Sequence, residues 1–389
     1  EGLFMLRFAG MLRNERLYFG VSALCGLFWP LLVTLFHPFG RRLRRAEENR
    51  SGGGLRFLVI RLDEIGDMVT TLPMIKALAK DNPGATIDLW CNPSVGEWME
   101  GQDGLHRVWK GQAPPIEMVY DVVIEGRGRW RTLLYALRSG VRARRDRGTI
   151  RLQRRLVGKP QLHEWDINLV LAGPWLKAGP EESLRCMGLD QPGQSLLRTV
   201  PAARTEAELF LNRNDLTHYA ILHTGARKLL RRWSLHRWAE LARRLHVDMN
   251  LDIVFVGTPD EQGDVERIRA MLDFETHTWM EGRPVSRLIS LLGGANLMVG
   301  NESGPMHLAV ATGCPTVGLF GPGEPEIFSP KVPFFKALHK KLPCNPCAQI
   351  RCVFPDNPCM NRIQVEEVLQ AVLELRPPAL ANLPASDRI

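Results

Sequence analysis

The chain has 389 residues, a length that favours two domains because a domain averages roughly 150 residues. Hydrophobic residues make up 45% of the chain and charged residues 24%, a balance that excludes a disordered, collagen-like or low-complexity protein. Lys and Arg number 50 against 42 Asp and Glu, and the net charge of +8 favours an anionic substrate or lipid surface. The basic residues are not interleaved with aromatic ones and form no known recognition module, so we expect no nucleic-acid partner.

An uncharged apolar stretch lies near the N-terminus. Residues 17–40 contain no Lys, Arg, Asp or Glu and are long enough to cross a hydrocarbon core of roughly 30 Å. Arginines flank the stretch, namely Arg13, Arg16, Arg41, Arg42, Arg44 and Arg45. We therefore predict a membrane-associating segment over residues 1–50, with residues 17–45 contacting the membrane. Because Pro30 interrupts the stretch, it either spans the membrane or lies in its plane; an amphipathic hairpin packed on the protein body or on a partner is the alternative.

Two blocks of alternating strands and helices follow a Gly-rich hinge at residues 51–54. The first block has predicted strands at 56–62, 86–90 and 120–125 and a helix at 68–80. The second has predicted strands at 219–223, 251–256, 297–299 and 316–320 and helices at 234–244, 284–292 and 304–312. The pattern predicts an α/β protein with Rossmann-like domains over residues 51–205 and 206–376, facing a central cleft, and a tail at 377–389.

The loop after the first strand carries Gly66 and Asp67. Gly66 allows a sharp turn of the backbone, and Asp67 lies at the N-terminus of the next helix. Asp67 is either an N-cap or a base that deprotonates an acceptor hydroxyl in the cleft.

Three loops of the second block suit a nucleotide-linked ligand. The segment Thr224-Gly225-Ala226-Arg227-Lys228, with Arg231, offers small residues and cations that fit a diphosphate without a metal. The spacings of a P-loop and of a dinucleotide fingerprint are missing. Glu261 follows the next strand, where it either binds a ribose or favours the helix dipole.

The third loop, residues 300–307, reads GNESGPMH. Its N–H groups around Ser303 and Gly304 open a helix and can bind an anion. Ser303 stands fourth in GNESG, so the G-x-S-x-G elbow of serine hydrolases is absent. His307 either contacts a ligand or is a satisfied core histidine.

Together these loops resemble glycosyltransferase family 9, the ADP-heptose:lipopolysaccharide heptosyltransferases, over about residues 55–375. The signals are LVIRLDEIGDMVTTLPMIKAL, HTGARKLLRRWSLHRWAEL and LMVGNESGPMHLAVATGCPTVGLFGP. The resemblance implies a GT-B fold and inverting transfer of heptose from ADP-L-glycero-D-manno-heptose to the inner core of lipopolysaccharide, without a catalytic cofactor. It also implies that Asp67 is the general base, and that an anionic glycolipid acceptor is met at the cytoplasmic face of the inner membrane.

The loop residues and the resemblance together predict the binding residues. The donor set is Thr224, Gly225, Ala226, Arg227, Lys228, Arg231, Glu261, Glu302, Ser303, Gly304, Pro305 and His307. The acceptor set is Gly66, Arg127 and Arg129, the two arginines coming from a basic run with one acid between residues 127 and 159. Glu302 stands where the family usually has Asp, so another donor sugar stays open. Three rival functions also stay open: transfer to another acceptor, a sugar-nucleotide epimerase of the same fold, and a non-catalytic membrane scaffold.

Four cysteines near the C-terminus form the pattern C-x2-C-x4-C-x6-C: Cys344, Cys347, Cys352 and Cys359. The spacing is compact enough to wrap one tetrahedral metal ion, zinc or iron, in a structural role. Reduced thiols and disulfides are the alternatives.

Overall fold

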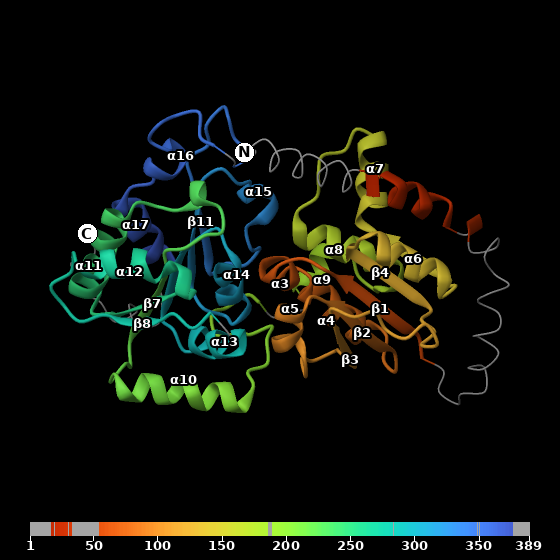
Figure 1. Cartoon of the computed structure of the whole chain (residues 1–389), viewed down its shortest axis with the longest axis horizontal. Coiled ribbons are helices and arrows are strands. Elements are labelled where there is room, and N and C mark those ends of the chain that lie inside the picture. Colours follow the sequence, from red (N-terminus) through yellow and green to blue (C-terminus); the bar gives the residue numbers. More distant parts are fainter. Residues whose placement is uncertain are drawn as a thin grey trace. The chain divides into compact units, whose positions relative to one another are not determined.

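The computed structural model describes residues 17–18, 20–29, 31–32, 54–185, 189–282, 284–347, 349 and 351–375. The chain divides into two compact units, residues 1–187 and 188–389, each built on one parallel sheet (Figure 1). The predicted α/β architecture of two Rossmann-like domains is confirmed.

Unit 1 has five parallel strands in the order β3-β2-β1-β4-β5. The strands are β1 (Arg56–Arg61), β2 (Thr86–Cys91), β3 (Arg107–Lys110), β4 (Val122–Arg127) and β5 (Ala143–Asp146). The helices are α3 (Ile65–Val69), α4 (Leu72–Asp81), α5 (Pro93–Met99), α6 (Trp130–Arg138), α7 (Arg147–Leu156), α8 (Glu164–Ala172), η1 (Gly173–Trp175) and α9 (Pro180–Arg185). The central strand β1 is apolar almost throughout because both of its faces are covered.

Unit 2 has six parallel strands in the order β11-β10-β9-β6-β7-β8. The strands are β6 (Tyr219–His223), β7 (Asp252–Val256), β8 (His277–Trp279), β9 (Leu297–Asn301), β10 (Thr316–Phe320) and β11 (Phe335–His339). The helices are α10 (Pro201–Arg213), η2 (Leu229–Arg231), α11 (Leu235–Met249), η3 (Pro259–Glu261), α12 (Gln262–Arg269), α13 (Val285–Gly293), α14 (Gly304–Ala311), α15 (Pro325–Phe328), α16 (Pro358–Asn361) and α17 (Val365–Leu375).

Strand order places the candidate loops within each unit. The first strand of each sheet lies between its second and its fourth strand, so the chain leaves it in one direction and later returns on its other side. Ligands of doubly wound sheets bind at this switch point, beyond the carboxyl ends of the strands. In unit 1 the switch point lies between β1 and β4, and in unit 2 between β6 and β9.

The predicted helix over residues 68–80 is wrong in one respect, because it is two helices, α3 and α4. The hydroxyls of Thr70 and Thr71 donate to the backbone carbonyl of Asp67, at 2.8 and 2.9 Å. Side-chain bonds of this kind compete with the helical hydrogen bonds. Pro73, the second residue of α4, lacks an N–H and therefore favours the start of a new helix there.

In the apolar N-terminal segment, the described residues 17–18, 20–29 and 31–32 are helical except for a turn at Phe28, and they pack on the rest of unit 1. Tyr18 and Trp29 are buried in the same core cluster as Leu58 and Ile60 of β1. Tyr18 donates its hydroxyl to Glu125 at 2.6 Å, and the Trp29 indole donates to the Val141 carbonyl at 3.2 Å. These described residues therefore pack on the body of unit 1. The arginines at 41–45 lie outside the described residues, and no helix among those described has the length and apolar character of a membrane span.

A buried arginine joins this segment to the sheet. The Arg144 side chain has no exposed surface; it pairs with Glu125 and Asp146 and donates to the Ser22 hydroxyl at 2.6 Å. The two carboxylates are buried as well. A buried charge is tolerated only when it is paired, so the three charges depend on one another.

We predict that Arg144→Ala lowers the free energy of unfolding by about 3–5 kcal/mol, because it leaves two buried carboxylates unpaired. Denaturant unfolding of the full chain measures the change. Arg185→Ala is the matched control, since Arg185 lies on the surface of the same unit and pairs only with the exposed Glu182 among the contacts described. Equal unfolding of both variants would contradict the role given to Arg144.

Candidate active site

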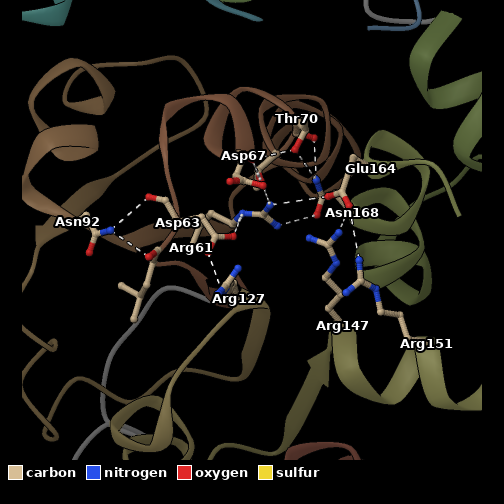
Figure 2. Close-up of polar contacts among 12 residues, drawn as sticks. Arg61, Asp63, Asp67, Thr70, Asn92, Arg127, Arg147, Arg151, Glu164 and Asn168 are labelled. Carbon is tan, nitrogen blue, oxygen red and sulfur yellow. Dashed lines mark hydrogen bonds and ion pairs between the residues drawn. The ribbon is translucent and has the colours of Figure 1, made fainter. Parts of the chain in front are cut away.

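Asp67 lies at the switch point of unit 1, in the first turn of α3 (Figure 2). The N-cap of α3 is Glu64, so the N-cap interpretation of Asp67 is wrong. The Asp67 side chain is 34% exposed, and its Oδ1 lies 3.0 Å from the Arg61 guanidinium. The carboxylate is therefore oriented by an ion pair and still reaches solvent.

Arg61 organises the surroundings of Asp67. Its side chain is fully buried at the end of β1, and its Nε lies 3.2 Å from Asp63 Oδ2. Its Nη1 donates to the Asn168 amide oxygen at 3.3 Å, and Asn168 donates to the Thr70 carbonyl at 2.8 Å. Figure 2 shows the guanidinium between these partners. The network thus fixes the loop from β1 to α3 from inside the unit.

Three further arginines lie around these carboxylates. The predicted acceptor residue Arg127 has its Nε 3.0 Å from Asp63 Oδ1, while Arg147 and Arg151 pair with Glu164 (Figure 2). Burial lowers the pKa of Arg147, and the neighbouring Arg61 and Arg151 lower it further. Crowded guanidiniums of this kind favour an anionic ligand.

The other predicted acceptor residues flank this cluster. Gly66 belongs to α3, next to Asp67, and Arg129 is exposed at the N-cap of α6.

In unit 2 the loop after β6 is held by Asn301, the last residue of β9. Its side-chain amide donates to the carbonyls of Thr224 and Gly225, at 2.7 and 3.3 Å. A Cβ atom at Gly225 would lie 1.7 Å from Glu261 Oε1, so a larger residue would displace the Glu261 carboxylate. Gly225 thus packs directly against Glu261, and with the bonds from Asn301 the loops after β6, β7 and β9 lie together.

A histidine links two of these loops. This residue is His223. Its Nδ1 lies 3.1 Å from the Ser303 hydroxyl, and its Nε2 lies 3.6 Å from Glu261 Oε2. Burial would raise the pKa of Glu261, but His223 and the Thr258 N–H lower it to about 2. Glu261 is therefore an anion that orients His223, which in turn orients Ser303 at the start of α14.

Arg231 and Glu302 form the charged part of the predicted donor site. Arg231 Nη1 lies 3.1 Å from Glu302 Oε1, and Arg231 Nε donates to the Gln349 amide oxygen at 2.7 Å. Glu302 is 5% exposed. Its burial raises its pKa to about 7, with the repulsion of Glu324 added and the attraction of Arg231 opposing.

The remaining predicted donor residues lie on the same loops. Ala226 is buried, Lys228 is half-buried and Arg227 is exposed. Gly304 and Pro305 are the first residues of α14, and His307 is buried one turn further on.

Several residues of these two sites had not been predicted from sequence, Glu164 of α8 among them. Three others end strands: Arg61 ends β1, His223 ends β6 and Asn301 ends β9. Asn168 lies in α8, and Gln349 lies in the cysteine-rich loop. Arg61 had a signal, since it is a charge at the end of an apolar strand.

All four C-terminal cysteines line one pocket, together with Leu230 and Phe354. The thiols are free, and Asn357 of the same loop donates to the Leu230 carbonyl at 3.0 Å. Within the described ranges no three His, Cys, Asp or Glu side chains are close enough to hold a metal ion as they stand. The cysteine-rich loop thus packs against η2, which carries Arg231.

Comparison with solved structures gives the fold class. The E. coli ADP-heptose lps heptosyltransferase II has a TM-score of 0.61 and 20% sequence identity, covering 82% of this chain and 98% of that one. A family 9 glycosyl transferase from Veillonella parvula has a TM-score of 0.64 and 19% identity, covering 82% and 97%. The chain therefore has the GT-B fold of two-domain glycosyltransferases.

Sequence comparison matches part of the chain to a known protein family. Residues 180–357 match the model of glycosyltransferase family 9 (heptosyltransferase). Lipooligosaccharide heptosyltransferase 2 of Campylobacter jejuni is 24% identical over 151 residues, 38% of this chain and 48% of that protein. The chain thus spans about half the length of this curated relative. The family match covers a little under half of the chain, and over these residues the chain is similar to glycosyltransferase family 9, in agreement with the sequence motifs.

The raised pKa of Glu302 predicts a pH dependence of stability. An unfolded Glu titrates near 4.5, so between pH 4.5 and about 7 the native state binds more protons than the unfolded state. The stability contribution of Glu302 is full below pH 4.5 and is lost as pH rises to about 7. Relative to Glu302→Gln, the wild type should lose about 3 kcal/mol of unfolding free energy across this window.

Denaturant unfolding at a series of pH values measures this difference. Glu208→Gln, an exposed carboxyl on α10 of the same unit, is the matched control and should leave the profile unchanged. Parallel profiles for wild type and Glu302→Gln would show that Glu302 does not titrate as described.

Proposed function

We propose that the chain is an inverting glycosyltransferase that moves heptose from ADP-L-glycero-D-manno-heptose to the inner core of lipopolysaccharide. The observation that carries the proposal is the oriented, solvent-reaching carboxylate of Asp67 at the switch point of unit 1. The donor loops at the switch point of unit 2 support it, as does the match of residues 180–357 to family 9.

In the proposed donor complex, unit 2 binds ADP-heptose. Thr224, Gly225 and the N–H groups at the start of α14 are placed at a strand end and a helix N-terminus, where diphosphates bind. Arg231 supplies a guanidinium that can hold phosphate oxygens bidentately.

Glu302 is assigned to the donor sugar. Its Oε2 is buried and has no hydrogen-bond partner among the described residues, which suits a sugar hydroxyl. Because Glu is longer than the usual Asp, the shape of this subsite sets which sugar is accepted. Glu261 is assigned to the ribose, next to Gly225.

In the proposed reaction, Asp67 removes the proton of the acceptor hydroxyl as its oxygen attacks the anomeric carbon. The bond from that carbon to the diphosphate breaks, and ADP leaves with the electron pair. Arg231 and the N–H groups stabilise the charge that grows on the diphosphate. Arg61 pairs with Asp67 and holds it in place, and Arg127, Arg147 and Arg151 attract an anionic acceptor. Each step uses a side chain or N–H group of the protein, so no cofactor is assigned to catalysis.

The proposed acceptor is anchored in a lipid bilayer, so the proposed place of action is the cytoplasmic face of the inner membrane. The net charge of +8 supports attraction to such an anionic surface.

We predict that Asp67→Asn lowers the rate of transfer by about 100- to 10,000-fold, because general-base catalysis is lost. The measurement is ADP release together with acceptor mass, using ADP-heptose and heptose-deficient lipopolysaccharide. Glu117→Gln is the matched control, since Glu117 is an exposed carboxyl of the same unit. It should keep wild-type activity.

Two results would overturn the proposal. Turnover of the donor without acceptor would indicate an epimerase, and no turnover by folded wild type with any nucleotide sugar would indicate a non-catalytic scaffold. Transfer with another nucleotide sugar alone would correct the donor and keep the class.

We also propose that Cys344, Cys347, Cys352 and Cys359 bind one structural metal ion, zinc or iron. The four thiols share one pocket, and the pKa of Cys359 is raised by burial and then by the other three cysteines. A bound cation would relieve this repulsion between thiolates. Among the described residues the thiols are too far apart to bind one ion together, so the loop would close around the ion as it binds.

Elemental analysis of the anaerobically purified full chain tests this site, with about one zinc or iron ion per chain expected. The double variant Cys352→Ser/Cys359→Ser should lose the metal, while Cys25→Ser in unit 1 should retain it. Metal-free wild type, or equal metal content in the double variant, would contradict the proposal.

A further inference from the structure

The described residues of the N-terminal segment, 17–18, 20–29 and 31–32, have a second face that the rest of unit 1 does not cover. Leu17, Leu24, Phe28 and Leu31 are 61, 53, 57 and 59% exposed. Their spacing of seven, four and three residues places them along one side of a helix. We call these four side chains the apolar stripe. Half-exposed apolar side chains aligned in this way mark an interaction surface.

The other side of the same segment is fixed to unit 1. Tyr18, Ser22 and Trp29 are 4, 1 and 3% exposed, and each makes a polar contact with the unit. Ser22 contacts the buried Arg144 in addition to Asp146. The polar groups on the buried face of the segment thus have partners in unit 1, while the apolar stripe on its other face is exposed.

Basic residues adjoin the segment. Helix α7 lies beside it at one end of unit 1 (Figure 1), and the Thr149 hydroxyl donates to the Ala23 carbonyl at 3.3 Å. Along α7, Arg155 is exposed, whereas Arg151 faces Glu164 on the side of the candidate active site. The helix ends on Leu156, which is 72% exposed. Apolar side chains next to cations are the composition of an interfacial membrane surface.

We propose that the apolar stripe docks on an anionic lipid bilayer with the helix lying in the membrane plane. The acyl chains then cover the stripe, and Arg155 of α7 meets the phosphate headgroups. A spanning orientation would remove Tyr18, Ser22 and Trp29 from their buried partners. A second copy of the chain would bring like charges together, whereas an anionic bilayer neutralises them.

This inference extends the proposed membrane location of the enzyme, and its test uses neither donor nor acceptor. The full chain is mixed with vesicles of phosphatidylcholine alone or of equal parts phosphatidylcholine and phosphatidylglycerol, and the bound fraction is measured by flotation. Wild type should bind the anionic vesicles, with binding weakened by salt and released by alkaline carbonate.

The double variant Leu24→Glu/Phe28→Glu should bind at least about ten-fold more weakly, because two carboxylates replace apolar side chains in the stripe. Its thermal unfolding midpoint should match the wild type, since the buried face is untouched. Leu209→Glu is the matched control: Leu209 is an apolar residue of α10 in unit 2, 48% exposed.

Several outcomes would overturn the inference. Equal binding by the double variant would exclude the stripe, and wild type that resists alkaline carbonate would indicate a spanning segment. A wild-type dimer in solution that the double variant dissociates, without vesicle binding, would assign the stripe to a second copy. Loss of vesicle binding with transfer intact, or the reverse, separates this inference from the proposed function.

Discussion

A guanidinium buried at the end of β1 is the constraint on which the first site depends. The Arg61 side chain has no exposed surface, and an unpaired charge at that position would destabilise the unit severely. Its partners are therefore fixed: Asp63 and Asp67 through ion pairs, and Asn168 through a hydrogen bond. The carboxylate of Asp67, the proposed base, is thus placed by the same pairing that makes the buried charge tolerable.

In unit 2 the buried carboxyl of Glu302 is only partly paired. Glu302 has Arg231 as its ion-pair partner among the described residues, and one of its carboxylate oxygens accepts no hydrogen bond. Burial therefore outweighs the attraction, and the pKa of Glu302 rises to about 7. Glu261, which has both His223 and a backbone N–H as partners, has its pKa lowered to about 2. The difference marks Glu302 as the carboxyl that a ligand would satisfy.

Local sequence patterns sufficed for the seven inner strands and the main loops, but they missed the four edge strands, β3, β5, β8 and β11, which have only three to five residues each. The apolar runs at 56–62 and 219–223 predicted buried parallel strands, and the Gly and Ser residues of GNESG predicted a turn into a helix. Pairings between distant residues had no such signal. Arg61 meets Asn168 across 107 positions, and Ser303 meets His223 across 80. Hydropathy also failed to separate the two faces of the N-terminal segment, because the face buried in the core and the exposed apolar stripe both consist of apolar side chains.

In the proposed reaction Asp67 acts as the base of a single displacement of ADP from the anomeric carbon. The stereochemistry of the product tests this mechanism most directly. Proton NMR of the purified product gives the anomeric configuration of the transferred sugar. A configuration opposite to that of the ADP-linked donor is predicted, because the acceptor oxygen attacks the face opposite to ADP. The same configuration as the donor would contradict a displacement in which Asp67 acts as the base.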